Sequence, residues 1–221
     1  MTTEADFNYA HNYAQERQDM VESQLRRRGI HDERVLDAMR RIPRHEFVPT
    51  EARSVAYGDH PIPIGENQTV SQPFIIAISL QALCLTGSET VLEVGTGSGY
   101  QTALLGLLAR SVYSIERHAS LASGSETILA QLGLINVKVL VGDGSQGLRQ
   151  FAPYGAILVS AAAPRVPVSL LEQLSDNGRM VLPVGPPHAQ ELQLVRAQDG
   201  QPSIEVLEGC RFVPLIGAEG Y

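Results

Sequence analysis

The fold is decided by one stretch near the middle of the chain, Val91-Leu92-Glu93-Val94-Gly95-Thr96-Gly97-Ser98-Gly99-Tyr100. Its first four residues read as a buried strand, which carries the carboxylate of Glu93 two places before the first glycine. Three glycines at alternate positions then lead into a helical pattern over 101–108, and glycine lets a backbone turn sharply and approach a ligand closely. A strand that feeds such a turn and then a helix N-terminus predicts a nucleotide-binding site.

The spacing of the glycines narrows the choice of ligand. The dinucleotide-binding fingerprint places its third glycine three residues after the second. Here the third glycine, Gly99, is only two positions after the second, Gly97. Tyr100 occupies the position where the fingerprint would have its glycine. This spacing favours a nucleoside ligand without a pyrophosphate, of which S-adenosylmethionine is the commonest. An ordinary tight strand–helix connection with incidental glycines is the alternative at this point.

The composition excludes several classes of protein. A chain of 221 residues with 43% hydrophobic and 19% charged residues is typical of one large globular domain, or of a domain with an appendage. A net charge of −7 argues against a nucleic-acid partner, which normally requires a basic face. No apolar run approaches the ~18 residues of a membrane span. The polar residues 1–15 are not a secretory signal, so we expect no membrane partner.

The cysteines and histidines give no sign of a disulfide framework or a metal centre. Cys84 and Cys210 are too few and too far apart for either, and the six histidines show no metal-ligand spacing. Cys84 lies in an apolar helical stretch, where we expect a small core residue. We therefore expect no metal and a reducing, cytoplasmic location.

Apolar runs alternate with helical patterns through the second half of the chain. Helices are predicted at 120–132 and 168–174, and a final hairpin of 191–196 with 203–207 is predicted around Gln198-Asp199-Gly200. Further strands are expected at 112–115, 137–141, 156–159 and 179–182. The pattern predicts an α/β fold with a doubly wound, mostly parallel, Rossmann-like sheet and a C-terminal antiparallel hairpin. Ligands of such sheets bind beyond the carboxyl ends of the strands.

The first half of the chain is predicted to be helical around an irregular segment. Helices are expected at 15–28, ending at Gly29, and from Asp32 to just before Pro43. Residues 44–70 carry no regular pattern, and a loop of this length predicts the wall of a site. The next helix opens at Ser71 or Gln72, with Ser71 the better N-cap, and ends near Gly87.

These elements define one domain behind a short tail. We expect a partly ordered tail over 1–15 and a single domain over 16–221. Within the domain, 16–90 supplies N-terminal helices and the substrate wall, 91–185 the cofactor-binding core, and 186–221 the hairpin and a further wall.

Three acidic residues fall at equivalent places on consecutive strands. Glu93 lies beside the glycine turn, Glu116 ends the second strand of the core, and Asp143 follows the third. Glu116 suits two hydrogen bonds from ribose hydroxyls, and Asp143 suits an adenine amine. Glu93 is expected to order the glycine turn and to help hold the amino end of the cofactor, directly or through water. Each acid alone could equally be a helix cap or a solvated strand end.

Several motifs together resemble the protein-L-isoaspartate O-methyltransferase family. The resemblance covers about residues 16–217, and its most specific part is Gln68-Thr69-Val70-Ser71-Gln72-Pro73. The other matching stretches are Gly65–Asn67, Leu92–Thr102, Gly142–Gly144, Ala161–Pro164, Leu182–Gly185, Arg211–Leu215, Met20–Met39 and Arg44–Pro49.

The resemblance implies an enzyme that transfers a methyl group from S-adenosyl-L-methionine to the free α-carboxylate of L-isoaspartyl residues. Its partners would be damaged proteins and peptides, whose repair starts through a succinimide. We expect a cytoplasmic monomer. The sequence departs from the family at Asn67, where relatives often have glycine, and at Gly155, where they usually have an acid. Asn tolerates positive φ, so the turn at Asn67 is expected to survive.

The resemblance also assigns site residues, and Ser71 matches the active-site serine. The positions that match cofactor-binding residues are Gln72, Glu93, Gly95, Thr96, Gly97, Gly99, Glu116, Asp143 and Gly144. The positions that match the substrate-binding walls are Ile64, Gly65, Gln68, Thr69, Arg211, Val213 and Leu215.

Three other functions compete with this one. A methyltransferase acting on a small molecule or RNA would keep the cofactor half, although the acidic balance weighs against RNA. A nicotinamide-dependent oxidoreductase is disfavoured by the glycine spacing and by the position of Asp143. A nucleoside-binding regulatory protein without catalysis is the third.

Overall fold

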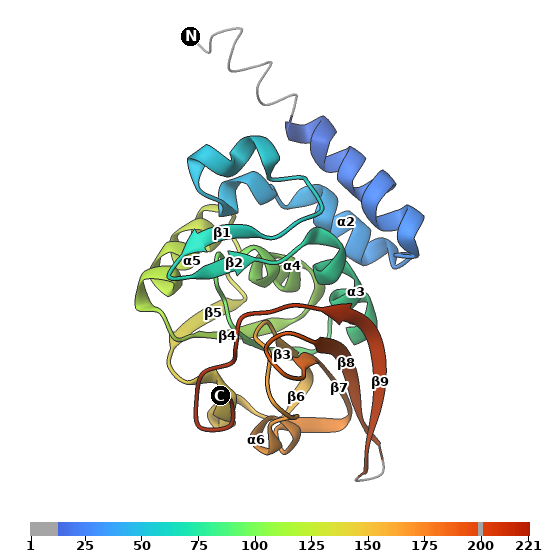
Figure 1. The fold of residues 1–221 in the computed structure, drawn as a ribbon, viewed down its shortest axis with the longest axis vertical. Coiled ribbons are helices and arrows are strands. Elements are labelled where there is room, and N and C mark those ends of the chain that lie inside the picture. Colours follow the sequence, from blue (N-terminus) through green and yellow to red (C-terminus); the bar gives the residue numbers. More distant parts are fainter. Residues whose placement is uncertain (1–12, 199–200) are drawn as a thin grey trace, which may run out of the picture.

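A seven-stranded sheet forms the centre of the protein (Figure 1). The computed structural model describes residues 13–198 and 201–221. The strands lie in the order β5-β4-β3-β6-β7-β8-β9, parallel up to β7 and antiparallel beyond it. Their bounds are β3 (Thr90–Val94), β4 (Ser111–Glu116), β5 (Val137–Val141), β6 (Tyr154–Val159), β7 (Leu174–Val184), β8 (Gln190–Gln198) and β9 (Gln201–Cys210). Since β3 pairs with both β4 and β6, the winding reverses there, and the doubly wound prediction is confirmed.

Both faces of the sheet are covered by apolar side chains. On one face, Val91 joins the core formed with α3 (Pro73–Leu83), α4 (Tyr100–Leu108) and α5 (Ala119–Gln131). On the other face, Leu92 joins a second core that includes Leu170 of α6 (Val168–Leu171). Burial on both faces explains why the strands read as continuous apolar runs.

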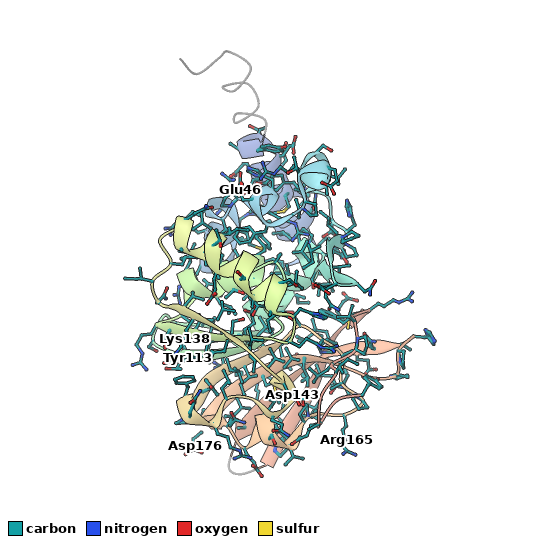
Figure 2. The ribbon with its side chains drawn as sticks, turned by 90° about the vertical axis from the view of Figure 1, so that its left-hand side faces the viewer. Glu46, Tyr113, Lys138, Asp143, Arg165 and Asp176 are labelled. Atoms are coloured by element: carbon teal, nitrogen blue, oxygen red, sulfur yellow. The ribbon has the colours of Figure 1, made fainter. Side chains whose placement is uncertain are left out.

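Between β5 and β6 the chain makes two 3-10 turns, η5 (Gly144–Gln146) and η6 (Arg149–Phe151). Phe151 of η6 stacks on Tyr113 of β4, with ring centroids 3.9 Å apart. Lys138 pairs with Tyr113 across β4 and β5 and lies 5.2 Å from the centre of the Phe151 ring. Figure 2 shows Tyr113 and Lys138 side by side at this edge, where the aromatic stack covers the sheet.

The N-terminal helices have the predicted positions. Residues 13–28 form one helix whose later part is a π segment, η1 (Met20–Leu25), and a 3-10 turn, η2 (Arg26–Arg28). Gly29 ends it at φ 93°. Since residues 13–15 are helical, the predicted tail over 1–15 is too long, and its residues 1–12 lie outside the described residues.

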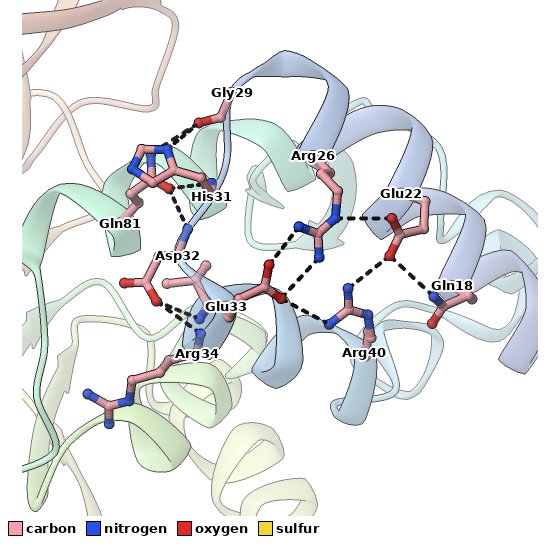
Figure 3. A network of polar contacts seen from close by, with 11 residues as sticks. Gln18, Glu22, Arg26, Gly29, His31, Asp32, Glu33, Arg34, Arg40 and Gln81 are labelled. Atoms are coloured by element: carbon pink, nitrogen blue, oxygen red, sulfur yellow. Dashed lines mark hydrogen bonds and ion pairs between the residues drawn. The ribbon is translucent and has the colours of Figure 1, made fainter.

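A polar network joins these helices to one another (Figure 3). The Gln81 side-chain oxygen, on α3, accepts hydrogen bonds from the backbone N–H groups of His31 and Asp32 at 2.8 and 3.0 Å. Arg26 donates to Glu22 and to Glu33, which opens α2 (Glu33–Arg41). The first helix, α2 and α3 are thereby fixed relative to one another. Within the described part of the chain, no helix is long and apolar enough to cross a membrane.

The segment 44–70 is more regular than its sequence suggests. It contains the 3-10 helices η3 (Arg44–Phe47) and η4 (Thr50–Val55) and a hairpin of β1 (Ile62–Gly65) with β2 (Gln68–Val70). The two turn residues, Glu66 and Asn67, have φ of 50° and 56°, as a two-residue hairpin turn requires. The prediction of an irregular loop is therefore wrong, whereas Asn67 adopts the expected positive φ.

Three boundaries also differ from the predictions. Helix α3 ends at Leu83 instead of near Gly87, and Cys84 is its exposed C-cap at φ 47° instead of a core residue. Helix α6 ends at Leu171 instead of 174, and β7 starts at Leu174 instead of 179. The C-terminal hairpin is confirmed and longer than predicted, and residues 199–200 of its turn lie outside the described residues.

The N-terminus of α2 gives a stability prediction. The Asp32 carboxylate accepts from the backbone N–H of Arg34 at 2.9 Å, which satisfies a donor that the helix leaves unpaired. We expect Asp32→Ala to lower the free energy of unfolding by about 1 kcal/mol in urea titrations, because this cap is lost. Asp32→Asn keeps an acceptor and serves as the control. Equal stability of the Ala variant and the wild type would contradict the assignment.

Candidate active site

Two adjoining cavities lie at the carboxyl edge of the sheet, at its switch point. The first is bordered by the glycine turn, by Glu116 at the end of β4, and by residues 213–216. The second lies between Gln72, the N-cap of α3, and residues 209–213, at the end of β9 and directly after it. Four residues line both cavities, and we call the place where they meet the junction: Thr69, Ser71, Ser160 and Val213.

The glycine turn is shaped by positive φ at each glycine. At Gly97, with φ 53°, a Cβ atom would lie 3.4 Å from Cδ1 of Ile64, so the β1–β2 hairpin closes over the turn here. At Gly99, with φ 87°, a Cβ atom would lie only 2.9 Å from Cβ of Ser125 in α5. Gly95, Thr96 and Gly97 line the first cavity as predicted, whereas Gly99 is required for the packing of the turn on α5.

Glu116 is held rigidly at the wall of the first cavity. One carboxylate oxygen accepts from the backbone N–H of Gly97 and the other from that of His118, both at 2.9 Å. Its side chain is almost entirely buried, and each oxygen keeps a further lone pair. The carboxylate is therefore oriented to accept a pair of hydroxyl groups.

Glu93 lies behind the glycine turn and does not line either cavity. Its carboxylate accepts from the hydroxyls of Thr102 and Ser114 at 2.5 and 2.6 Å and from the side-chain amide of Gln101 at 3.1 Å. Complete burial raises the pKa of Glu93 to about 7. The three hydrogen bonds favour the ionised form and lower the pKa, but burial outweighs them. Since Gln101 itself lines the first cavity, any effect of Glu93 on a ligand passes through such a neighbour.

Asp143 follows β5 but is engaged by the C-terminal segment. Its two oxygens accept from the backbone N–H groups of Ser145 and Ala218, each at 2.9 Å. Burial alone would raise the pKa of Asp143, but the hydrogen bonds from Ala218 and Ser145 outweigh it and the pKa is lowered. Gly142 and Gly144, and not Asp143, line the first cavity. Figure 2 shows Asp143 in the sheet half of the molecule, away from Glu46 in the helical half.

Ser71 lies at the junction and is not the N-cap of α3. The N-cap is Gln72, which makes no side-chain cap hydrogen bond. Instead Asp59 accepts from the backbone N–H of Phe74 at 3.1 Å and from the Gln72 amide at 2.6 Å. The prediction that Ser71 caps the helix is therefore wrong, because a carboxylate distant in sequence does so. Gln72, predicted at the cofactor, borders the second cavity only.

A buried arginine that the sequence analysis missed fixes the backbone of Ser71. Arg44 is entirely buried and donates to the carbonyl oxygens of Ala56 and Ser71 at 2.8 and 2.9 Å. Its guanidinium lies 5.0 Å from the centre of the Tyr100 ring, directly after the glycine turn. Burial lowers the pKa of Arg44, opposed by Tyr100, Tyr57 and Asp59. In the sequence, the sign of a buried arginine is its position between the apolar residues Ile42 and Phe47, both of which the structure buries.

The residues predicted to bind substrate are divided between the two cavities. Gln68 and Leu215 line the first cavity, and Arg211 lines the second. Ile64 lies against Gly97, and Gly65 is exposed at the hairpin turn, so neither borders a cavity. Thr69 and Val213 lie at the junction.

Comparison with known sequences identifies the family. A family model described as "Protein-L-isoaspartate(D-aspartate) O-methyltransferase" matches residues 15–220. The chain belongs to this family. A protein-L-isoaspartate O-methyltransferase of Koribacter versatilis is 53% identical over 209 residues, covering 95% of this chain and 94% of its own. One of Syntrophus aciditrophicus is 51% identical over 212 residues, covering 95% and 97%.

Solved structures of the same family have the same fold. A protein-L-isoaspartate O-methyltransferase aligns with a TM-score of 0.81 at 27% identity, covering 92% of this chain and 67% of its own. A putative protein-L-isoaspartate O-methyltransferase from Plasmodium falciparum, in complex with S-adenosyl-L-homocysteine, aligns with a TM-score of 0.80 at 25% identity, covering 90% and 98%. The Rossmann-like fold predicted from the alternating strands and helices, and the methyltransferase class implied by the resemblance, are thus confirmed.

The burial of Glu93 gives a pH-dependent stability prediction. The pKa of Glu93 is raised from 4.5 to about 7 on folding, so the folded protein binds this proton more tightly than the unfolded chain. The stabilisation from this proton is complete below the unfolded-state pKa of 4.5. It is lost as the pH rises through the folded-state pKa of about 7. Over this window we expect the wild type to lose about 3 kcal/mol relative to Glu93→Gln, which cannot ionise.

Urea unfolding of both proteins at a series of pH values between 4.5 and 8 measures this difference. Other titrating groups are common to both proteins and cancel in the comparison. Parallel stability curves would show that Glu93 does not titrate in this range.

Proposed function

We propose that the chain transfers the methyl group of S-adenosyl-L-methionine to the free α-carboxylate of L-isoaspartyl residues in damaged proteins and peptides. The observation that carries the proposal is the junction, where Ser71 lines both the cavity built on the glycine turn and the second cavity, which is bordered by residues 209–213. A donor held in the first cavity and a carboxylate entering from the second would meet beside Ser71.

The residues of the first cavity fit this cofactor. The Glu116 carboxylate would hold the two ribose hydroxyls, with both oxygens already oriented by backbone N–H groups. Gly142 and Gly144 would border the adenine, while Thr96 and Gln101 would border the amino-acid end. Gly97 lines this cavity with φ 53° and has no side chain, so the backbone there can approach a ligand closely. The relative from Plasmodium falciparum, solved with S-adenosyl-L-homocysteine, supports the same ligand class.

The chemistry requires positioning more than proton transfer. The bound cofactor supplies an electrophilic methyl group, and a carboxylate is already a nucleophile at neutral pH, so no general base is needed. Attack in line with the breaking bond neutralises opposite charges, and a site that excludes water and aligns the two groups favours it. The Ser71 hydroxyl orients the carboxylate, and Arg44 fixes the main chain of Ser71 from behind. The backbone nitrogen of the next residue then attacks the ester carbonyl and methanol leaves, which gives a succinimide whose hydrolysis returns some normal aspartate.

The setting of the reaction follows from the sequence. We propose a monomer in the cytoplasm, with damaged proteins and peptides as its partners. The free thiols of Cys84 and Cys210 support a reducing compartment. The net charge of −7 supports a peptide over a nucleic acid as substrate.

The activity is tested with two peptides of identical composition, one containing isoaspartate and one aspartate, incubated with cofactor labelled in its methyl group. We expect base-labile label on the isoaspartyl peptide only, because its peptide bond runs through the β-carboxyl and leaves the α-carboxylate of that residue free. Label on RNA or on a small molecule, and on neither peptide, would favour the other methyltransferase functions.

Ser71→Ala tests the role of the hydroxyl. We expect kcat for the isoaspartyl peptide to fall about tenfold or more, since a hydrogen bond to a charged group is lost. Cofactor affinity, measured by calorimetry, should stay nearly unchanged. Wild-type turnover in this variant would show that Ser71 does not orient the substrate.

Glu116→Ala tests the role of this carboxylate in binding the cofactor. We expect the Kd of S-adenosyl-L-homocysteine to rise by about tenfold to a hundredfold, because two hydroxyl donors lose a charged acceptor. The variant Glu191→Ala, at an exposed residue of β8 that does not line the first cavity, makes the same change in charge and is the control. A similar Kd in all three proteins would exclude Glu116 from the cofactor site.

A further inference from the structure

Ser160 borders the junction together with Ser71, from a separate part of the chain. It directly follows β6, and its backbone N–H donates to the carbonyl of Val94 at 2.8 Å, so its position is fixed by the central strands. Like Ser71, it lines both cavities. Two hydroxyl groups from separate elements therefore border the place where the cavities meet.

The proton of the Ser160 hydroxyl is oriented by its neighbour. The side-chain nitrogen of Gln101 lies 2.6 Å from the Ser160 hydroxyl oxygen and 3.1 Å from a carboxylate oxygen of Glu93. An amide NH₂ group has two protons, and an ionised carboxylate only accepts, so the Gln101 amide donates one proton to each partner. Ser160 is thus the acceptor from Gln101, and its own proton remains available to another group.

Glu93 sets this direction. If the Gln101 amide were reversed, its oxygen would face the Glu93 carboxylate, and two acceptors would lie against each other in a buried place. The Glu93 carboxylate is itself fixed by hydrogen bonds from Thr102 and Ser114, at 2.5 and 2.6 Å. When Glu93 is ionised, above its pKa of about 7, its carboxylate therefore leaves the Ser160 hydroxyl as a hydrogen-bond donor at the junction.

We propose that Ser160 is a second catalytic hydroxyl, which donates a hydrogen bond to the isoaspartyl α-carboxylate, and that Gln101 and Glu93 are positioning residues for its proton. The inference rests on the proposed function. A carboxylate held by Ser71 alone can rotate about that one hydrogen bond. A second donor from another element fixes its plane, so that one oxygen faces the methyl group.

The Ser160 proton is not transferred in this step. The bond between sulfur and the methyl carbon breaks, and its electron pair stays on the sulfur. A bond from the carboxylate oxygen to the methyl carbon forms at the same time. The charges cancel, and the hydroxyl keeps its proton throughout.

The test begins with Ser160→Ala, assayed with the isoaspartyl peptide at saturating S-adenosyl-L-methionine. We expect kcat/KM for the peptide to fall about tenfold, since one hydrogen bond to a charged group is lost. The Kd of S-adenosyl-L-homocysteine should change by less than about twofold. Ser160→Thr keeps the hydroxyl and should restore most of the activity. Ser79→Ala is the matched control, because that buried serine donates only to Ile75 within its own helix.

A double-mutant cycle then tests the orienting role of Gln101. Gln101→Met has similar length but no amide, and we expect it to lower kcat/KM for the peptide in the wild-type background. In the Ser160→Ala background the same change should have no further effect on this quantity, because Gln101 acts on the peptide through Ser160.

Three results would overturn the inference. Ser160→Ala could leave kcat/KM for the peptide unchanged, or it could weaken only the cofactor, which would assign the hydroxyl to the cofactor alone. Additive effects in the cycle would show that Gln101 acts independently. These results are separate from the proposed function, whose failure would appear as unlabelled isoaspartyl peptide with the wild-type enzyme.

Discussion

The arrangement of the site depends on one buried cation. Arg44 lies entirely inside the protein, and a buried guanidinium is costly unless polar groups surround it. The carbonyl oxygens of Ala56 and Ser71 and the face of Tyr100 supply this environment. Because these three partners belong to the 3-10 region, the residue after β2 and the start of α4, Arg44 fixes the wall that carries Ser71 to the glycine turn.

The negative and positive charges of the site lie on opposite sides of the junction. The carboxylates Glu93 and Glu116 lie around the glycine turn, on the side that would hold a cationic sulfonium. Arg44 lies behind Ser71, on the side that would receive an anionic carboxylate. Opposite charges are thus brought together across the junction by groups that are already in place, which limits the reorganisation required during the reaction.

Much of this arrangement could be predicted from local pattern, and the remainder could not. The parallel core was predictable because β3, β4 and β6 are buried on both faces and read as apolar runs. The β1–β2 hairpin was missed because strands of four and three residues are too short for a periodic signal. Ser71 was misread as a helix cap because the capping carboxylate, Asp59, is distant in sequence from the N–H group it accepts. Gln101 and Ser160 are 59 residues apart, and only the reversal of winding at β3 brings them into contact.

The junction borders the second cavity, whose walls include β2 with the residues after it on one side and residues 209–213, at the end of β9, on the other. A side chain that is still packed in its own helix or strand cannot enter between two such walls. For a protein client, the damaged residue must first leave its fold, at a frequency set by the free energy of local opening. The repair rate in a folded client is then governed by the dynamics of that client, and damage in its most stable elements is the last to be reached.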